Sequence, residues 1–585
     1  MKRSPKIQSL LQLLLFAGIV VFINILANAR IGNTSLYGSL DLTEEGKFTL
    51  TKNTKQILDS LDKVIFVKVL LDGEFPAGFK RLQRETRELL EDFKARSPLV
   101  EYVFSDPNAG SIDEINARRK QLKDDYGMNP VQFNVGTKSG TSRQLIYPYA
   151  IISMGERDLT INLLENEIPG VLPDETINTS VALLEYKFAN AIQKLMQSPA
   201  EKPAILFTAG HGELSELETA DLENDLRQYY NTGRVVLDSV PVLPDQVEVL
   251  VVAKPHDAFS DKDKFKIDQY IMGGGKVLWL IDRIGVDLDS LSGRREFYPK
   301  PNDLALDDQL FKYGIRMKDE LVLDMQCSVI PLTSGSIGNA PKLDYFPYPY
   351  HLVVSPRVDH PIVKGLGMVN LLYPSPIDTE NSPPPGIDRT VLLTSSDKTL
   401  FQLLPVGLDF NFQRYGLDDT KFDKPPQPLA VLMEGEFPSF FANRVEESFL
   451  EVYKKIGAQF REKSDPTRMI LVADGDVARN PVDWREGRFG KLGFNRFEFE
   501  GKGYLFANKD FLINAIEYLI NSHGVIEARS KEVKLRLLDT SAAERNAGLW
   551  RLVNIGLPLV LLGLFGVLYN FIRRRRFATN PSDRT

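Results

Sequence analysis

The chain has 585 residues and a net charge of −7 at pH 7, with 43% hydrophobic and 25% charged residues. This composition is ordinary for a globular protein, and the length predicts more than one domain, at ~150 residues each. The mild charge, without a long basic face between the termini, disfavours nucleic-acid binding. The one cysteine, Cys327, excludes an intramolecular disulfide and a cysteine zinc motif.

The chain begins with an apolar segment. Residues 7–29 carry no charge and follow Lys2, Arg3 and Lys6. At ~1.5 Å per residue this segment is long enough to cross a hydrocarbon core of ~30 Å as a helix. Residues 27–29 also fit a signal-peptidase site, so a cleaved secretory signal is the alternative. The apolar stretch exceeds the usual signal core, which favours an uncleaved anchor.

Residues 31–170 predict a first α/β domain, also of the doubly wound kind. Thr51 is placed to cap a helix that starts at Lys52. Apolar, β-branched runs then alternate with amphipathic segments, which indicates strands and helices of one layer with a mainly parallel sheet. The predicted strands are 64–71, 99–104, 131–135 and 149–154, and the predicted helices are 52–61, 79–96 and 112–126.

Residues 171–525 predict a second, doubly wound α/β domain. Its strands are expected at 203–208, 247–253, 276–282 and 469–473, and its helices at 176–196, 217–230, 261–272 and 511–521. Between about 290 and 465 prolines and aromatic residues interrupt the pattern, and we expect an insertion of irregular and β structure. An aromatic–proline run at 345–350 fits a partner surface or packing between lobes equally well.

The C-terminal end predicts a second anchor. Residues 526–548 are charged and indicate a helical stalk, 549–573 a transmembrane helix, and 574–585 a tail. Arg573, Arg574, Arg575 and Arg576 end the span. Basic residues flank both spans on their outer sides, so both termini are expected in the cytoplasm and the region between them in the periplasm. An exported chain without disulfides is more typical of a bacterial envelope than of eukaryotic secretion.

No nucleotide site is apparent. A phosphate loop needs G-x-x-x-x-G-K-[ST], and the nearest match, Gly275-Lys276, continues with Val277. There is also no G-x-G-x-x-G after a strand. We therefore expect no cofactor and no binding of ATP by this chain alone.

The sharpest local motif is the loop at residues 209–213, where a strand turns into a helix. Open α/β sheets bind ligands at such turns, and Gly210, His211, Gly212 and Glu213 offer close backbone approach and acid–base groups. The position that holds the nucleophile in G-x-S-x-G hydrolases is occupied by His211. A structural turn capped by Glu213 is the first interpretation, a ligand or partner loop the second, and catalysis the third.

Two further motifs carry weaker signals. Asp474 and Asp476 follow a buried strand, where paired carboxylates hold a cation or simply turn the chain; we predict no metal site. Gly563 and Gly566 lie three residues apart in the second span, and small residues on one face favour helix packing in lipid. Pro558 near the start of that span predicts a bend.

The chain resembles the GldG family of gliding-motility-associated ABC transporter auxiliary proteins of Bacteroidetes, which are often described as substrate-binding. The similar segments lie at residues 41–50, 73–76, 207–213, 360–362, 434–437, 474–476 and 531–539, followed by the second span and its arginines. The resemblance implies a permease and a cytoplasmic ATPase as partners in the inner membrane, and a link to gliding and its secretion system. It supplies no substrate and no catalytic residue.

These observations predict a non-catalytic, membrane-anchored auxiliary subunit that couples a periplasmic α/β body to a permease and an ATPase. Two anchors at opposite ends of the chain suit this role better than shuttling delivery of a solute. The alternatives are a ligand-binding receptor that uses the loop at 209–213, and an enzyme. Contact with membrane lipid is expected, and self-association of the chain stays open.

Overall fold

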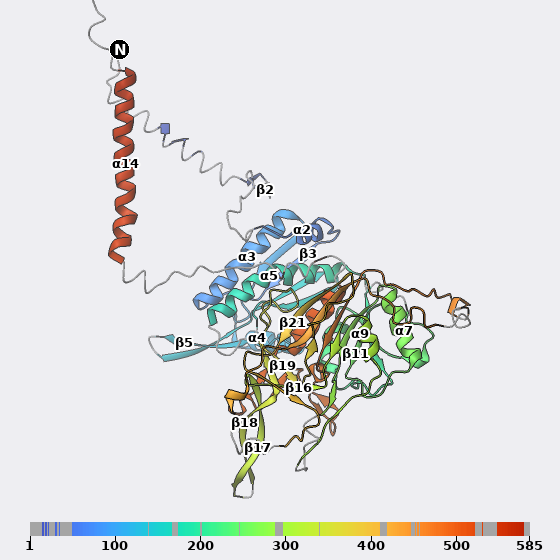
Figure 1. Ribbon diagram of the computed structural model, residues 1–585. Coiled ribbons are helices and arrows are strands. Elements are labelled where there is room, and N and C mark those ends of the chain that lie inside the picture. Colours follow the sequence, from blue (N-terminus) through green and yellow to red (C-terminus); the bar gives the residue numbers. More distant parts are fainter. Residues whose placement is uncertain are drawn as a thin grey trace, which may run out of the picture. The chain divides into compact units, whose positions relative to one another are not determined.

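The computed structural model describes residues 49–137, 140–165, 173–198, 202–244, 246–286, 296–338, 340–409, 418–445, 451–520 without 452 and 456, and 547–577, with isolated positions elsewhere. Met1–Glu532 form one compact unit and Val533–Thr585 a second one. The larger unit contains two main sheets with their helices (Figure 1). Its division into domains at residue 170 stays a prediction.

The first sheet has four strands in the order β4-β3-β7-β8, covered on one face by three helices. In β3 the buried Ile65, Val67 and Val69 alternate with outward-facing residues, as expected for a sheet with one covered face. The elements are α2 (Lys52–Asp59), β3 (Ile65–Val69), α3 (Ala77–Arg96), β4 (Val100–Phe104), α4 (Ile112–Asp124), β5 (Val131–Thr137), β6 (Gly140–Ile146), β7 (Tyr149–Met154), β8 (Arg157–Asn162) and α5 (Pro173–Met196).

The prediction of a mainly parallel first sheet is wrong. Only β3 and β4 are parallel, whereas β3 with β7 and β7 with β8 are antiparallel. The chain reverses from β7 into β8 through a tight turn in which Gly155 has φ 64°, so no crossover helix is needed. The predicted cap at Thr51 is confirmed, because its side chain accepts a hydrogen bond from Thr54 N at 3.3 Å.

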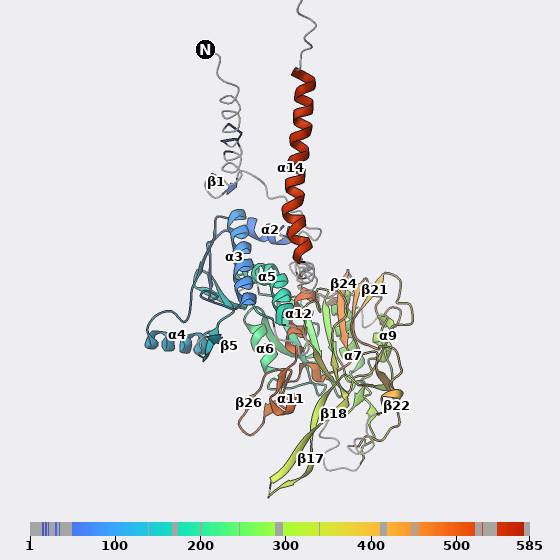
Figure 2. The same ribbon diagram turned by 90° about the vertical axis from the view of Figure 1, so that its left-hand side faces the viewer.

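Helix α5 belongs to the first sheet's core, although it follows residue 170. Ile177, Val181 and Phe188 of this helix are buried in one cluster with α2, α3 and the first sheet. Phe188 meets Phe93 of α3 edge to face, with ring centroids 6.4 Å apart. Figure 2 shows α3 and α5 side by side over this sheet.

The second sheet has seven strands in the order β10-β9-β11-β12-β24-β23-β21. The first five are parallel to one another, and β23 and β21 join antiparallel at one end. The elements are β9 (Ala204–Ala209), α6 (Ala220–Arg227), β10 (Asn231–Val236), β11 (Val247–Ala253), α7 (Asp261–Met272), β12 (Lys276–Leu280), α9 (Asp307–Lys312), β21 (Ile387–Thr394), β23 (Pro428–Gly435), β24 (Thr467–Val472) and α12 (Asn508–Ile520).

Helices cover both faces of this second sheet, as the sequence predicts. Helices α6 and α12 pack with Val249, Val251 and Leu278 on one face. Helices α7 and α9 pack with the alternate residues of the same strands, Val252 and Trp279, on the other. The strands are buried on both faces, which explains their continuous apolar runs.

The region predicted as an insertion is mostly β structure, and it also supplies β21 and β23 to the second sheet. A hairpin of β17 and β18 projects from the body (Figures 1 and 2). The remaining elements of the body are β1 (Arg30–Ile31), β2 (Thr34–Ser35), β13 (Ile284–Gly285), β14 (Lys300–Pro301), β15 (Arg316–Met317), β16 (Glu320–Asp324), β17 (Cys327–Ile337), β18 (Ala340–Val354), β19 (Val369–Leu372), β20 (Ile377–Asp378), β22 (Thr399–Leu403), β25 (Val482–Asp483), β26 (Arg488–Phe489), β27 (Phe494–Asn495), α11 (Glu498–Gly501) and β28 (Tyr504–Leu505).

The described residues of the second unit form one helix, α14 (Ala547–Phe577), with Pro558 inside it. Ala547–Arg575 is long and apolar enough to cross a membrane, with a mean hydropathy of 2.2. The predicted first span, apart from isolated positions, and most of the predicted stalk lie outside the described residues.

Candidate functional site

The strand order creates a switch point at the carboxyl end of β9. Strand β9 lies between β10 and β11, so the chain proceeds outward from β9 in both directions. Ligands in open α/β sheets bind outside the carboxyl ends of the strands at such a point. The predicted loop at residues 209–213 follows β9, and Asp474 and Asp476 follow β24 at the same edge. Strands β11 and β12 lie between them, and no hydrogen bond or ion pair joins the two motifs among the described residues.

The loop after β9 is built around His211. Gly210 and Gly212 have φ 110° and 74°, and a Cβ at Gly212 would lie 3.1 Å from Cβ of His256. The imidazole stacks on Phe259, with ring centroids 3.9 Å apart. Its Nδ1 lies 3.4 Å from Glu213 Oε1, and its Nε2 lies 3.4 Å from Asp263 Oδ2.

The charged groups of this loop are committed to one another. Burial disfavours the charged imidazole, but hydrogen bonds and charges from Glu213 and Asp263 outweigh burial and raise the pKa of His211. Burial likewise opposes ionisation of Glu213, but the imidazole of His211, 3.4 Å from its Oε1, and the backbone N–H of His211 lower the pKa of this carboxyl. Glu213 Oε2 also accepts a hydrogen bond from the backbone N of His211 at 2.6 Å. This geometry is that of a self-contained turn, and a role of the loop in binding stays a prediction.

A buried ion cluster lies at the carboxyl ends of β11, β12 and β24. The ammonium of Lys254 is 2.5 Å from Asp476 Oδ2 and 3.1 Å from Asp282 Oδ2. Asp474 accepts hydrogen bonds from the backbone N of Asp476 and of Leu372, each at 2.8 Å. The backbone is adapted to the cluster, because Lys254 has φ 54° and a Cβ on Gly475 would lie 2.6 Å from Cβ of Lys254.

One lysine faces three carboxylates in this cluster, so its charge is unbalanced. Burial raises the pKa of Asp282, and burial with the neighbouring carboxylates raises the pKa of Asp474 well above its usual range. Burial disfavours the charged lysine, but Asp282 and Asp476 together raise the pKa of Lys254. The carboxylate oxygens lie within 4.8 Å of one another, which is close enough to share a cation. The ammonium of Lys254 supplies positive charge at this place, and the raised pKa values of Asp282 and Asp474 reduce the negative charge that it faces.

Sequence analysis found Asp474 and Asp476 but missed Lys254 and Asp282. Each missed residue directly follows the last apolar residue of a buried parallel strand, at Ala253-Lys254 and Ile281-Asp282. The carboxyl ends of adjacent parallel strands meet at one edge, so this pattern was an available signal.

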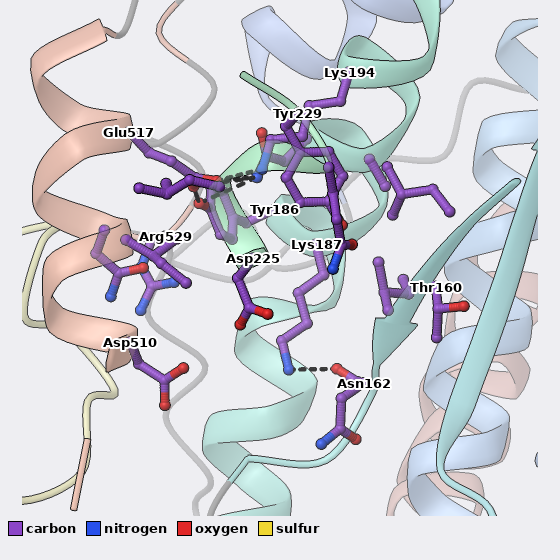
Figure 3. Close-up of a pocket in the computed structure, with 18 of the residues that line it drawn as sticks. Thr160, Asn162, Tyr186, Lys187, Lys194, Asp225, Tyr229, Asp510, Glu517 and Arg529 are labelled. Carbon is purple, nitrogen blue, oxygen red and sulfur yellow. Dashed lines mark hydrogen bonds and ion pairs between the residues drawn. The ribbon is translucent and has the colours of Figure 1, made fainter. Parts of the chain in front are cut away.

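A second polar region lies between helix α5 of the first sheet and helices α6 and α12 of the second. It is a pocket of about 430 Å³ (Figure 3). Glu517 of α12 accepts hydrogen bonds from the Tyr186 hydroxyl, from Lys194 Nζ and, at 3.2 Å, from Asn190 Nδ2 of α5. Burial disfavours the charged carboxylate, but Lys194 and the hydrogen bonds outweigh it and lower the pKa of Glu517.

The rest of this pocket is also internally paired. Lys187 Nζ donates to the carbonyl oxygen of Asn162 at 2.6 Å (Figure 3). Arg529 Nε donates to the carbonyl oxygen of Pro361, outside the pocket lining, at 2.9 Å. Burial and the charge of Glu165 raise the pKa of Asp510 to about 6. The pocket is therefore a polar seam that fixes the helix layer of the first sheet to that of the second.

The remaining predicted residues, Gly563 and Gly566, lie in α14. A Cβ on either glycine would meet nothing within 4 Å. Their use as a packing face stays a prediction.

These elements define a mixed α/β body whose chain continues into a helix suited to crossing a membrane. Residues 202–515 match the family model ABC_transp_aux, described as an ABC-type uncharacterized transport system, and the chain belongs to this family. It is thus an auxiliary protein of an ABC transport system. Residues 44–153 match a domain of unknown function (DUF7088). No curated protein matches this chain.

Two solved structures align with large parts of the chain. The mmIFT52 N-terminal domain gives a TM-score of 0.29 and 11% identity over 54% of this chain and 96% of its own. A putative ThuA-like protein from Parabacteroides merdae ATCC 43184 gives a TM-score of 0.24 and 12% identity over 58% of this chain and 93% of its own. Both TM-scores lie below 0.5, so these similarities carry no argument about this chain.

Proposed function

We propose that the chain is a non-catalytic subunit that couples an α/β body in the periplasm to the permease and the cytoplasmic ATPase of an ABC transporter in the bacterial inner membrane. The observation that carries this proposal is the pairing of a transport-family body with the apolar helix α14, which ends in four arginines. The resemblance to the GldG family extends the proposal to gliding motility and its associated protein secretion.

The alternative of a receptor that binds its ligand at residues 209–213 has less support. His211 is paired with Glu213 through one ring nitrogen and with Asp263 through the other, so a ligand would have to displace existing partners. The same pairing weakens an acid–base role for His211.

The proposed topology places both termini in the cytoplasm. Lys2, Arg3 and Lys6 precede the first span, and the arginine run follows the second. Epitope tags at both ends should resist protease added to intact spheroplasts, while the body is digested. A mature N-terminus at Arg30 would instead establish that the first span is a cleaved signal.

The contact with the permease is proposed to lie on the face of α14 that carries Gly563 and Gly566. Close approach of helices at small residues is a main source of helix association in lipid. The full chain, tagged and purified from its native membrane, should recover a permease and an ATPase. The double variant Gly563→Leu and Gly566→Leu keeps the span apolar and should recover less of both.

A matched control replaces Leu561 and Leu564 by Ile, which changes apolar side chains of the same helix without filling the glycine face. If the glycine variant recovers the permease as well as the parent does, this face is not the contact. If the parent recovers neither a permease nor an ATPase, the coupling role itself is wrong.

A further inference from the structure

A cleft of about 690 Å³ opens beside the buried ion cluster. It lies where β24 ends and α12 begins, and Asp476, Arg479 and Asn508 line its floor together with His351 of β18. Its size is within the range of small-molecule sites, and its place at the carboxyl end of a parallel strand is where α/β sheets bind ligands.

The first sign of a ligand is His351. This side chain is only 4% exposed, yet its Nε2 has no hydrogen-bond partner among the residues that the structure describes. A buried polar atom without a partner costs free energy, so such atoms are rare unless something else satisfies them. Burial lowers the pKa of His351 to about 3, so its imidazole is neutral at pH 7 and can exchange hydrogen bonds with a hydroxyl group.

The second sign is the charge balance. Arg479 Nη2 lies 3.0 Å from Glu218 Oε1, and its Nη1 lies 3.5 Å from Asp476 Oδ1. The other oxygen of Asp476 is held by Lys254. Glu218, Asp476 and Arg479 are therefore in ion pairs before any ligand enters, and the remaining charged side chain of the lining, Arg496, lies over the ring of Phe497. A charged ligand would have to break these pairs, whereas a neutral one that both donates and accepts hydrogen bonds would not.

The third sign is the aromatic rim. Trp484 is 63% exposed and Phe494 is 44% exposed, and both line the cleft. Phe497 lines it as well and carries the guanidinium of Arg496 4.6 Å above its ring. Exposed aromatic rings beside fixed polar groups suit a ligand with one apolar face and several hydroxyl groups.

We propose that this cleft binds a neutral saccharide, with the apolar face of a sugar ring against Trp484 and its hydroxyl groups directed toward His351, Asp476 and Arg479. An extended peptide fits less well, because Pro331 removes a backbone donor from β17, an edge strand that lines the cleft. The inference does not depend on the coupling role, since a saccharide site and a permease contact can be lost separately.

The test uses the full chain in lipid nanodiscs, free of sugar-based detergents. Neutral oligosaccharides built from glucose, galactose, mannose or N-acetylglucosamine are titrated by calorimetry up to about 10 mM, which detects affinities near 1 mM. At least one should bind saturably. Trp484→Ala should weaken that binding about tenfold or more, while Trp550→Phe, in α14, should leave it unchanged.

Two variants of His351 test the site without changing the aromatic residues of the rim. His351→Gln retains a donor and an acceptor and should keep more affinity than His351→Leu, with both variants checked for folding by their melting temperatures. Absence of saturable binding to every saccharide overturns the proposal. So does unchanged affinity in Trp484→Ala, or binding of extended peptides at this cleft in place of saccharides.

Discussion

Replacing Lys254 by Met tests whether the ion cluster stabilises the second sheet. Lys254 is 3% exposed, and its ammonium contacts Asp476 and Asp282 at 2.5 and 3.1 Å. Removing one partner of a buried ion pair leaves uncompensated charge and typically costs about 3–5 kcal/mol. We therefore expect the free energy of unfolding of Lys254→Met to fall by about 3–5 kcal/mol at pH 7.

The loss in free energy of unfolding of Lys254→Met should depend on pH in a defined direction. Without the ammonium, the pKa values of Asp282 and Asp474 in the folded state lie further above those in the unfolded chain. A group with a raised folded pKa contributes stability below its unfolded pKa and loses it as pH rises. The variant should thus recover part of its stability between pH 7 and pH 5, by about 1.4 kcal/mol per pH unit for each proton taken up.

The assay is urea unfolding of the full chain, followed by tryptophan fluorescence, to which the buried Trp279 of the second sheet contributes. Lys262→Met provides the control, because Lys262 is exposed on α7 near the same edge and should change stability by less than about 0.5 kcal/mol. A Lys254→Met variant as stable as this control, or one whose deficit is equal at pH 5 and pH 7, would refute the reasoning.

Three further predictions follow from the same contacts. Gly475→Ala should destabilise the fold by about 1–3 kcal/mol, because its Cβ would lie 2.6 Å from Cβ of Lys254. The control Gly335→Ala, whose Cβ would have nothing within 4 Å, should not destabilise it. Equal melting temperatures of the two variants would contradict this prediction. Lys194→Met and Glu517→Gln should each lower the free energy of unfolding by about 3–5 kcal/mol, and the double variant should lose less than the sum of the two. Additive losses in this double-mutant cycle would show that the two side chains act separately. Because the pKa of His211 is raised, its charge stabilises the fold below the unfolded pKa and less as pH rises. The melting-temperature gap between the parent and His211→Gln should therefore shrink from pH 6 to pH 8.5, and a constant gap would argue against the paired imidazolium.

The regular elements of the fold were accessible from sequence because their apolar patterns are local. Helix α7 was predicted and found at Asp261–Met272, and β11 at Val247–Ala253. Strands β21 and β23 were missed because prolines interrupt the pattern between them and because antiparallel strands lack the βα alternation that identified the others. The glycine at position 155, between two apolar runs, was likewise an available signal for a hairpin.

The candidate site was only partly accessible, because its chemistry depends on contacts distant in sequence. Asp474 was recognisable in the sequence as part of a motif. The sheet order, which only the structure gives, places Lys254 and Asp282 in one cluster with it. The ion pair of His211 at Nε2 is made with Asp263, some fifty positions further along the chain. Nε2 of His351 has no hydrogen-bond partner among the described residues, and the ring of Trp484 is exposed. The two features indicate a binding site only because β18 and the loop after β25 line one cleft.

The coupling role is tested most directly by the rate of ATP hydrolysis of the transporter in lipid nanodiscs, measured with and without this chain. The account predicts that the full chain changes the rate of the permease–ATPase complex, that Gly563→Leu with Gly566→Leu abolishes this change, and that the chain alone hydrolyses no ATP. Identical rates with and without the chain, in a complex shown to contain it, would contradict the account.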